Sequence, residues 1–490
     1  MFDDSLPEIP VLGELSAREL VDAAQGWARA ENAACARKLA VMAEIFARRS
    51  ELPAGERELW WIDPDAAVAA ELAAALDVTR GLALAQTYRG VTLRDRLPRV
   101  ASLFEAGLIS DLLVRVIVWR TDLIDDEAVL AAVDADLAEQ IRAWGPLSRA
   151  RTETAIDALV ERHDPGALRR SRESQSSRDV EFGSPADAPG FTTLWARLFS
   201  SDAAVMRERV DRMANSVCEA DPRGIEERRS DALAAIGAGR DTLVCGCGGD
   251  DCEAARGSRP ARDTTVYMVA DQAAVEGARE AAAGSPERCA APAFVFGAGL
   301  VPNSLLSGLL DGARVRQVNH PGSGAAEPRY TASAALAAFV RCRDLTCRFP
   351  GCDRPASLAD IDHTVPYPLG PTHPSNLKCL CRFHHLLKTF WTGSDGWRDR
   401  QLPDGTVIWT SPTGHTYTTR PGSALLFPSL CQPTGRLWPG DPPEPDTGDT
   451  RGAMMPRRRH SRAHNRMRAV AAERRLNDPL VAERNRPPPF

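Results

Sequence analysis

Long hydrophobic runs are missing from this 490-residue sequence, and their absence argues against a membrane-crossing helix. No stretch of about 18 consecutive apolar residues occurs, although 43% of the residues are hydrophobic. Residues 1–10 contain neither a basic nor an apolar segment, so we expect no secretory signal. A phosphate-binding P-loop motif is also missing, which argues against ATP-driven chemistry. We therefore expect a cytoplasmic protein without a membrane partner, whose thiols stay reduced.

The charge of the chain is unevenly distributed. The length indicates two to four domains, because one domain usually takes about 100–200 residues. The net charge is -6, yet residues 451–490 contain 11 Arg and only three acids, which gives this tail a charge of +8. The charge of residues 1–450 is therefore -14, and bulk charge does not favour nucleic acid. Local basic patches would have to make any such contact, and the tail is one of them.

The first part of the chain, residues 1–180, is predicted to be a helical domain of unknown function. Ser16 and Glu19 form a capping-box pattern, and Asp63 precedes a proline at a first helical position. Gly107 fits the end of one helix and Ser110 the start of the next. No catalytic motif occurs among these helices. We interpret them as a packed scaffold through which the chain could form a homodimer.

Residues 181–330 are expected to be a mixed α/β continuation of this domain. Residues 192–198 and 264–270 have the alternation and β-branched content of strands, and a helix is expected over 201–218. Residues 172–177 are expected to form a loop before this region.

The last two regions differ sharply from each other. Residues 331–430 are predicted to start with a helix over 331–343 and to end in short strands over 397–419, separated by Pro-Asp-Gly and Pro-Thr-Gly turns. Residues 431–490 are predicted to be a disordered Pro-rich linker and an Arg-rich tail. The fold class expected for the chain is thus α+β with several domains.

Metal-binding residue types are concentrated between residues 342 and 415, which contain five of the nine His and five of the 12 Cys. Two pairs about 30 residues apart fit one tetrahedral structural zinc site: Cys347 with Cys352, and Cys381 with His384. Cys381 and His384 are separated by three positions and share one face of a helix. His385 is four positions from Cys381 and could take the place of His384, so both alternatives stay open. Cys342 and Cys379 are interpreted as structural thiols.

The zinc site does not explain Asp362, His363, Asn376 and His385, whose order resembles the HNH nuclease motif. Two sequence segments are similar to those of the 13E12-repeat HNH endonucleases: Arg-Asp-Leu-Thr-Cys-Arg-Phe-Pro-Gly-Cys-Asp-Arg-Pro (343–355) and Asp-Ile-Asp-His-Thr-Val-Pro-Tyr-Pro (360–368). In that family a long helical domain of unknown function precedes the nuclease. The resemblance is dense over about 330–430 and looser over about 60–300. It implies a small zinc-braced ββα-metal domain that hydrolyses DNA.

The resemblance also implies a role for each of these residues. Phosphodiester hydrolysis needs an activated water and a cation on the phosphate. His363 is expected to be the general base, because imidazole titrates near neutral pH, and Asp362 to hold Mg²⁺ or another divalent ion. His385 would be a second contact to the metal or the phosphate. Asn376 would either bind the metal or brace the loop that carries His363, and Lys388 would contact a phosphate.

Local charge agrees with a DNA substrate, because residues 341–400 carry a net charge of +3. The basic residues nearest to the expected metal ligands are Arg341, Arg343, Arg348, Arg354, Arg382 and Lys388. The rival hypothesis is a non-catalytic zinc-containing DNA-binding protein, the degenerate relic of a mobile-element nuclease. The two hypotheses differ in whether Asp362, His363 and a divalent ion line one open cleft.

A second group of cysteines lies upstream. Cys245, Cys247 and Cys252 are close in sequence, and Cys289 follows 37 residues after Cys252. Three or four thiolates could hold another zinc ion, although a Cys-x-Cys pair is tighter than most zinc sites use. The alternative is a set of reduced surface thiols.

Overall fold

The computed structural model describes residues 6–50, 57–145, 147–169, 179–184, 187–188, 190–256, 267–282, 293–302, 306, 310, 313–443, 452 and 454–486. It divides into two compact units. The first holds Met1–Ser171, His320–Ala424 and Ser429–Phe490, and the second holds Arg172–Asn319 with Leu425–Pro428. The predicted α+β class is confirmed, because helices and short antiparallel sheets occupy separate stretches of the chain.

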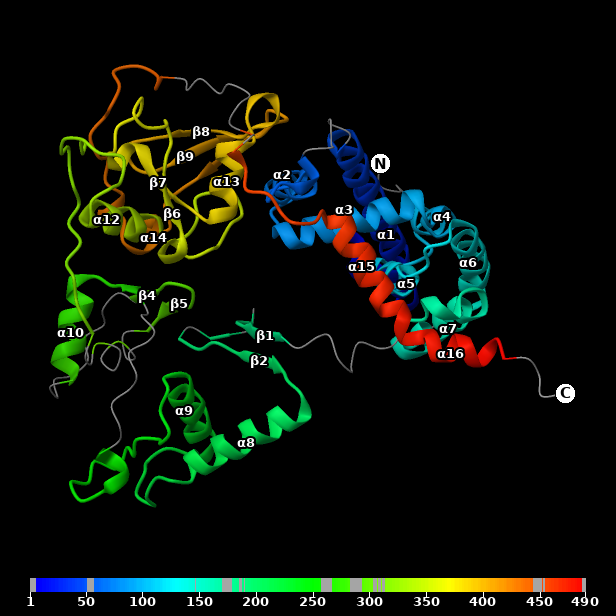
Figure 1. Ribbon diagram of the computed structural model, residues 1–490, viewed down its shortest axis with the longest axis horizontal. Helices are drawn as coiled ribbons and strands as arrows, with labels where there is room; N and C mark the ends of the chain where they lie inside the picture. The colour runs from blue at the N-terminus through cyan, green and yellow to red at the C-terminus, as the bar shows by residue number, and fades with distance from the viewer. Residues whose placement is uncertain are drawn as a thin grey trace. The chain divides into compact units, whose positions relative to one another are not determined.

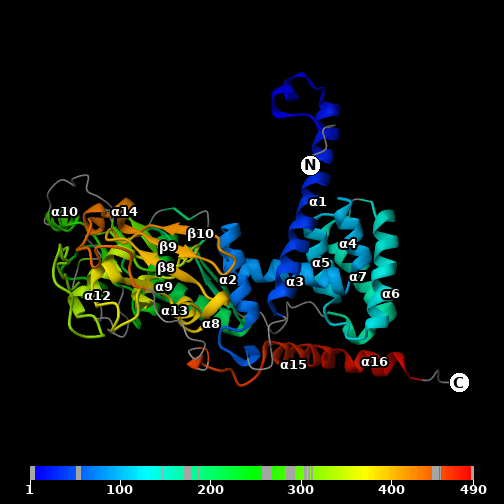
Figure 2. The ribbon, with the colours of Figure 1, turned by 90° about the horizontal axis from the view of Figure 1, so that it is seen from above.

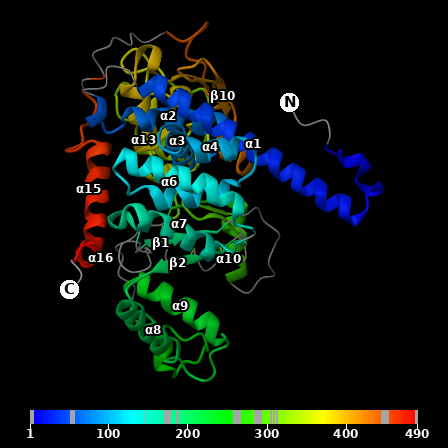
Figure 3. The ribbon, with the colours of Figure 1, turned by 90° about the vertical axis from the view of Figure 1, so that its right-hand side faces the viewer.

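The N-terminal helices of the first unit form a bundle with one extended core. They are α1 (Ala17–Ser50), α2 (Pro64–Leu76), α3 (Arg80–Asp95), α4 (Pro98–Glu105), α5 (Asp111–Thr121), α6 (Glu127–Gln140) and α7 (Arg149–His163). Leu39, Val100, Phe104 and Ile117 are buried at its centre. The N-terminal part of α1 extends beyond the helices on which the rest of it packs (Figures 2 and 3). Among the described residues, no helix is long and apolar enough to cross a membrane.

The helix boundaries lie where the capping signals predicted them. The backbone N–H of Ser16 donates to Glu19 at 2.8 Å, and the N–H of Glu19 donates to the Ser16 hydroxyl at 3.3 Å. Asp63 accepts a bond from Ala66 at the start of α2, and Ser110 accepts one from Leu113 at the start of α5. Gly107 follows α4 with a φ of +74°, and a Cβ there would lie 2.4 Å from a carbonyl oxygen of α1, so only glycine fits.

The C-terminal part of the first unit contains a hairpin, a helix and a three-stranded sheet. Its elements are α12 (Ala334–Asp344), β6 (Asp360–His363), β7 (Leu377–Leu380), α13 (Arg382–Phe390), β8 (Arg398–Gln401), β9 (Val407–Thr410), β10 (Thr416–Thr419) and α14 (Ser423–Leu426). β6 pairs antiparallel with β7, and Asp362 lies opposite Lys378. β9 lies between β8 and β10 in the second sheet (Figure 2). The predicted helix over 331–343 and strands over 397–419 are therefore confirmed.

Helix α2 belongs to the core of this C-terminal part as well as to the bundle. Ile62 and the alanines of one face of α2 pack with Phe349, Leu387 and Trp409 in one buried cluster. The indole N–H of Trp391 donates to the carbonyl oxygen of Ile62 at 3.0 Å. In Figure 1, α2 lies beside α13, which is more than 300 residues later in the sequence. The region of residues 331–430 thus shares its core with the N-terminal helices.

The prediction of a disordered tail is wrong for its basic part. α15 (Arg462–Arg474) and α16 (Asp478–Arg484) are helices that lie against the N-terminal bundle (Figures 1 and 2). Val470 is buried in the bundle core, which explains why the segment is ordered. Four tail arginines form ion pairs with acids of the bundle: Arg458 and Arg462 with Asp63, Arg466 with Asp122, and Arg474 with Asp164. Four of the 11 arginines of the tail therefore hold it against the bundle. Part of the predicted linker, residues 444–451, lies outside the described residues.

The second unit combines small helices and short strands. Its elements are β1 (Asp179–Phe182), β2 (Leu194–Arg197), α8 (Ser200–Ala214), α9 (Ile225–Gly237), β3 (Met268–Val269), α10 (Gln272–Ala282), β4 (Ala293–Val295) and β5 (Gly299–Val301). β1 pairs with β2, and β4 pairs with both β3 and β5. The strand expected over 192–198 is present at Leu194–Arg197, and the helix expected over 201–218 is present at Ser200–Ala214. The strand expected over 264–270 is present at Met268–Val269. Residues 264–266 and the loop expected at 172–177 lie outside the described residues.

Candidate metal centre and active site

One Cys₃His cluster, formed by Cys347, Cys352, Cys381 and His384, gathers on α13 and on the turn after α12. All four ligand atoms lie within 4.8 Å of one another. The Nδ1 atom of His384 is 3.3 Å from the Cys381 sulfur and 3.6 Å from the Cys347 sulfur. Ligands about 2.0–2.3 Å from a tetrahedral zinc ion are roughly 3.5–3.8 Å apart, so the cluster has room for one ion. The structure thus favours His384 over His385 as the fourth ligand.

Cys381 and His384 have the protonation states that a metal ion needs, whereas the pKa values of Cys347 and Cys352 are raised. Burial raises the pKa of Cys347 well above the ordinary value of a thiol. Hydrogen bonds from Cys347 and Cys352 hold the pKa of Cys381 far below that value, so this sulfur is already a thiolate. Burial lowers the pKa of His384, which keeps the imidazole neutral and able to coordinate a metal. The imidazole also stacks on Phe349, with ring centroids 3.9 Å apart, which fixes the orientation of the ligand.

The charged residues of the hairpin form a second, separate site around Asp362. This residue is buried on β6, and its Oδ2 atom is 2.7 Å from the Lys378 ammonium and 2.6 Å from that of Lys388. Burial alone would raise the pKa of Asp362, but these two cations bring it well below the usual range. Asp399 of β8 lies 2.6 Å from the ammonium of Lys378. Asp362 is therefore a carboxylate inside a buried network of two acids and two lysines.

His385 lies on the other side of the Asp362 carboxylate. Its Nδ1 atom is 2.8 Å from Oδ2 of Asp360, and its Nε2 atom is 3.6 Å from Oδ1 of Asp362. Asp360 and Asp362 are two positions apart on β6 and so share one face of the strand. A carboxylate that holds one nitrogen of an imidazole orients the other nitrogen, as is common where histidine binds a metal. Oδ1 of Asp362 and Nε2 of His385 therefore face each other, and one ion could contact both atoms.

His363 has different partners from those of Asp362. Its Nε2 atom is 2.9 Å from the hydroxyl oxygen of Thr372, and its ring stacks on Tyr330 at a centroid distance of 5.3 Å. Thr372 donates its single hydroxyl proton to main-chain carbonyl oxygens at residues 329 and 330, so it accepts from His363. Burial lowers the pKa of His363 to about 4, against the opposing pull of Asp362. The ring is thus neutral at pH 7, and its Nδ1 lone pair is available.

Asn376 braces the loop between β6 and β7. Its side-chain oxygen accepts a bond from the N–H of Val365 at 2.8 Å, and its amide donates to the carbonyl oxygens of Val365 and Pro371 at 3.0 Å. A Cβ on Gly370 would lie 2.6 Å from this amide, so the loop closes around Asn376 only with glycine at that position. Of the two roles left open for Asn376, the contacts of the described structure are those of a loop brace.

The basic residues predicted to meet DNA divide into two groups. Arg343 and Arg348 are buried, and both pair with Asp344, at 2.8 and 3.3 Å. They also donate to main-chain carbonyl oxygens, so their role is structural and the prediction of DNA contact is wrong for them. Arg354 and Arg382 are exposed. Arg341 is half-buried, and Lys388 lies on Asp362 and on the carbonyl oxygen of His363.

Sequence reasoning missed several residues of this site. Lys378 and Asp399 complete the buried charge network, Asp360 orients His385, and Thr372 orients His363. The alternation of Asp360 and Asp362 on a strand could have indicated a shared face. Lys378 could have been placed only with the hairpin register in hand. Tyr330 precedes the whole region and carries no sequence signal.

Comparisons with known proteins agree over the length of the chain. A family model described as "Domain of unknown function (DUF222)" matches residues 27–344. "Uncharacterized protein Rv3776" of Mycobacterium tuberculosis is 48% identical over 503 residues, which cover 100% of this chain and 95% of that protein. "Uncharacterized protein Rv2100" of the same organism is 47% identical over 523 residues, which cover 100% and 93%. No solved structure matches the chain.

Proposed function

The chain belongs to the DUF222 family, and we propose that it is a metal-dependent HNH endonuclease that hydrolyses DNA phosphodiester bonds. The observation that most supports this activity is the arrangement of β6, β7 and α13. The last residue of β6 is a neutral histidine with an oriented ring, and the residue before it is an ionised aspartate that faces a second oriented histidine. A general base beside two metal-ligand atoms is what phosphodiester hydrolysis requires.

His363 would act as the general base. Because Nε2 is engaged with Thr372, the Nδ1 atom would take a proton from a water molecule next to the scissile phosphate. The water oxygen would then form a bond to phosphorus as the bond from phosphorus to the leaving sugar oxygen breaks. Tyr330 and Thr372 hold the ring in position for this transfer, so little reorganisation is needed during the reaction.

Asp362 and His385 would hold the divalent ion. Their facing atoms, Oδ1 and Nε2, are 3.6 Å apart, and a hard oxygen with one nitrogen fits a small divalent cation that keeps several water ligands. When bound, such an ion would stabilise the charge on the phosphate and on the leaving oxygen. The Asp360 carboxylate holds Nδ1 of His385 and so would keep Nε2 of the same ring turned towards the ion.

The Cys₃His cluster would hold a structural zinc ion. All four positions of a tetrahedral site are taken by protein ligands, which leaves none for water or substrate. Such a zinc ion would tie the turn after α12 to the start of α13, the helix that carries His385 and Lys388. Arg354 and Arg382, which are exposed on either side of this region, would contact DNA phosphates without reading sequence.

Two observations favour the rival, a non-catalytic zinc-containing DNA-binding protein. The Oδ2 atom of Asp362 already has two ammonium partners, and ion pairs of this kind oppose the binding of a further cation. Among the described residues, Asp362 and His363 also share no side-chain partner, as expected for neighbours that point to opposite faces of a strand. In this alternative the lysines replace the metal, and the module binds DNA without cleaving it.

Cleavage of supercoiled plasmid by the full-length protein distinguishes the two functions. We expect nicking with Mg²⁺ or Mn²⁺, none with EDTA, and a loss of roughly 10²–10⁴-fold in rate for His363→Ala. His415→Ala is the matched control, because His415 is exposed on the turn between β9 and β10. Binding of DNA by the parent without any cleavage, in either metal, would support the rival. Cleavage by His363→Ala at the rate of the parent would overturn the proposed mechanism.

A further inference from the structure

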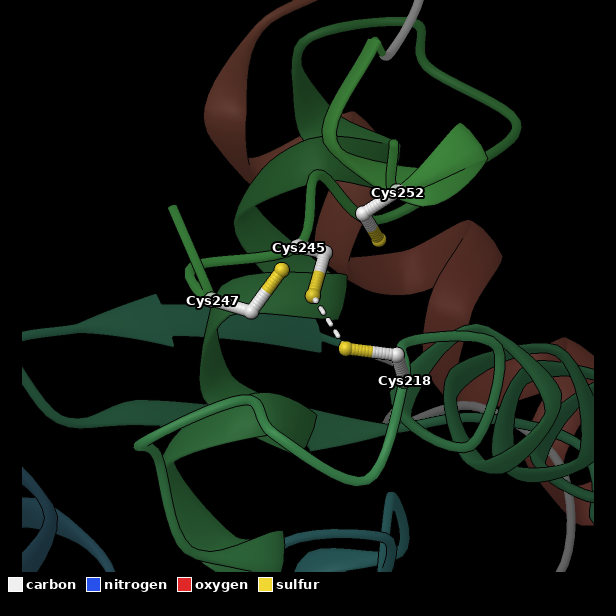
Figure 4. A group of neighbouring side chains, drawn as sticks. All are labelled: Cys218, Cys245, Cys247 and Cys252. Atoms are coloured by element: carbon white, nitrogen blue, oxygen red, sulfur yellow. Dashed lines mark hydrogen bonds between the residues drawn. The ribbon is translucent and has the colours of Figure 1, made fainter. Parts of the chain in front are cut away.

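Four cysteine sulfurs of the second unit converge on one point. They belong to Cys218, Cys245, Cys247 and Cys252, and all lie within 4.8 Å of one another. Figure 4 shows the four side chains pointing toward a common centre, with a contact of 3.5 Å between the sulfurs of Cys218 and Cys245. Four sulfurs at about 2.3 Å from a tetrahedral zinc ion are about 3.8 Å apart, whereas a disulfide needs about 2.05 Å. The observed contact fits a shared metal ion much better than a disulfide.

This four-cysteine cluster is assembled from two places in the sequence. Cys218 follows the end of α8, and the other three cysteines lie on the loop between α9 and Glu253. The cysteine that joins the three on this loop is therefore Cys218, which precedes Cys245 by 27 residues. Cys289, the partner considered from the sequence, lies outside the described residues. A pair of helices thus brings together cysteines whose spacing follows no common zinc motif.

One backbone amide in the loop after α9 donates to a cysteine sulfur of the cluster. The N–H of Gly249 donates to the sulfur of Cys247 at 3.5 Å. Gly249 comes two residues after the cysteine that it contacts. Donors of this kind stabilise negative charge on sulfur, as outer contacts do for metal ligands.

An ion-paired latch fixes the loop that carries Cys245 and Cys247. Arg223 donates to Asp221 at 2.7 Å and to the carbonyl oxygen of Val244 at 2.7 Å. Asp221 also accepts a bond from the N–H of Gly246, the residue between the two cysteines, at 2.8 Å. The segment just after Cys218 therefore holds the main chain on both sides of Cys245. These bonds hold Cys218 next to the loop without any bond between sulfurs.

The apolar core available to this part of the chain is small. Around α8 and α9 the buried cluster consists of Met213, Ala232, Ala235 and Leu243. A few alanines and two larger side chains bury little apolar area, and small domains of this kind commonly depend on a metal ion for stability.

We propose that the second unit binds a structural zinc ion through Cys218, Cys245, Cys247 and Cys252, in addition to the zinc proposed for the Cys₃His cluster. The ion would tie the end of α8 to the loop after α9 and so fix the angle between the two helices. Since cysteines fill all four positions, no open position is left for water, and the site is structural rather than catalytic. This site is independent of the proposed nuclease activity, because none of its ligands belongs to the first unit.

Metal analysis of the full-length protein, purified with a thiol reductant and without chelator, tests this proposal. We expect two zinc ions per chain in the parent and one in each of Cys218→Ser and Cys352→Ser. Cys35→Ser is the matched control, because Cys35 lies on α1 outside both clusters, and it should keep two. One zinc per chain in the parent, lost in Cys352→Ser and unaffected by Cys218→Ser, would overturn the second site. Iron in place of zinc would also overturn it, because a sulfur-only site can hold an iron–sulfur cluster.

X-ray absorption at the zinc edge keeps the test decisive if Cys218→Ser fails to fold. In Cys352→Ser the remaining zinc should have sulfur ligands only, at about 2.3 Å, with no nitrogen ligand at about 2.0–2.1 Å. A nitrogen ligand in that variant would mean that the remaining zinc lies in the Cys₃His cluster and not in the four-cysteine cluster.

Intact mass measured under native conditions tests whether the four cysteines form disulfides. A chain whose metal-free mass is about 4 Da lower after thiol reductant is left out, with one zinc fewer, would mean that the four sulfurs form two disulfides instead.

Discussion

The hydroxyl group of Thr372 accepts a hydrogen bond from His363, and this bond decides which nitrogen of the imidazole is free. The two atoms are 2.9 Å apart, and the proton of Thr372 is already directed at main-chain carbonyl oxygens of residues 329 and 330. His363 must therefore carry its proton on Nε2, and the unprotonated nitrogen is Nδ1. A residue of the loop between the strands thus sets the chemistry of a residue at the end of β6.

The first prediction follows from this bond. Thr372→Val keeps the shape of the side chain and removes the acceptor, so His363 can adopt either tautomer. We expect the single-turnover rate of plasmid cleavage to fall roughly 10- to 100-fold, the range found when a partner that orients a functional imidazole is removed. The same substitution at the exposed Thr416 of β10 should leave the rate unchanged. Equal rates for the parent and Thr372→Val would show that the tautomer does not matter.

The second prediction concerns pH. Burial lowers the pKa of His363 to about 4, so its base form is present above that pH and is lost as the pH falls through it. Since the free enzyme sets the acid limb of kcat/KM, this limb should lie below about pH 5 and not near 6.5. Cleavage rates from pH 4.5 to 8, with zinc content measured at each pH, test this expectation. A midpoint near 6.5 would mean that another group acts as the base or that His363 is solvated when DNA binds.

The third prediction tests whether Asp362 binds the metal ion or only contributes negative charge to the site. Asp362→Asn should strongly reduce cleavage and raise the Mg²⁺ concentration for half-maximal residual activity by at least roughly 10-fold. Asp399→Asn is the control, because it removes one negative charge from the same network and leaves the carboxylate of Asp362 in place. If both variants change the metal dependence equally, Asp362 acts through its charge alone and does not bind the metal.

The fourth prediction tests the shared core of α2 and the C-terminal region. Glu71 is buried on α2, where it pairs with Arg49 at 2.6 Å and accepts hydrogen bonds from Thr413. Glu71→Ala leaves Arg49 without this partner, which we expect to cost about 1–3 kcal/mol. Thermal unfolding should show a lower midpoint, and limited proteolysis should show faster cleavage near residue 413. Glu44→Ala, which removes only an exposed pair with Arg48, should change stability by less than about 0.5 kcal/mol.

The fifth prediction concerns the tail. Deletion of residues 457–490 removes four arginines that pair with acids of the bundle, and it also removes Val470 from the core. We expect a lower unfolding midpoint for the truncated protein, and the difference from the parent should shrink as salt screens the ion pairs. Truncation after residue 486 is the control. If the midpoint stays the same and only the salt dependence of DNA binding changes, the tail serves DNA binding, as its composition first indicated.

Local signals in the sequence predicted local structure well. The capping box at Ser16 and the N-caps at Asp63 and Ser110 all form, because each depends on residues within one helical turn. The Cys₃His cluster could be predicted for the same reason, since each of its ligand pairs lies within six residues. Even the choice between His384 and His385 needed only the direction of the side chains on α13.

Contacts between distant parts of the chain could not be predicted in this way. The arginines of the tail were counted as charge for DNA, because nothing near Arg474 in the sequence indicates that Asp164 is its partner. Arg343 and Arg348 were misjudged likewise, since their burial around Asp344 depends on the whole C-terminal sheet. Cys218 escaped notice because 27 residues separate it from Cys245.

The sharing of a core between α2 and the C-terminal region has a consequence for how the protein is made. Ribosomes add about 5–20 residues per second, so roughly 20–70 s pass between the synthesis of α2 and that of β9, which carries Trp409. During this time the apolar face of α2 has no partner, and the helix is exposed to proteases and chaperones. The proposed nuclease site cannot form on a chain that ends before β9. Premature termination anywhere before residue 410 is therefore expected to yield a product without the proposed activity.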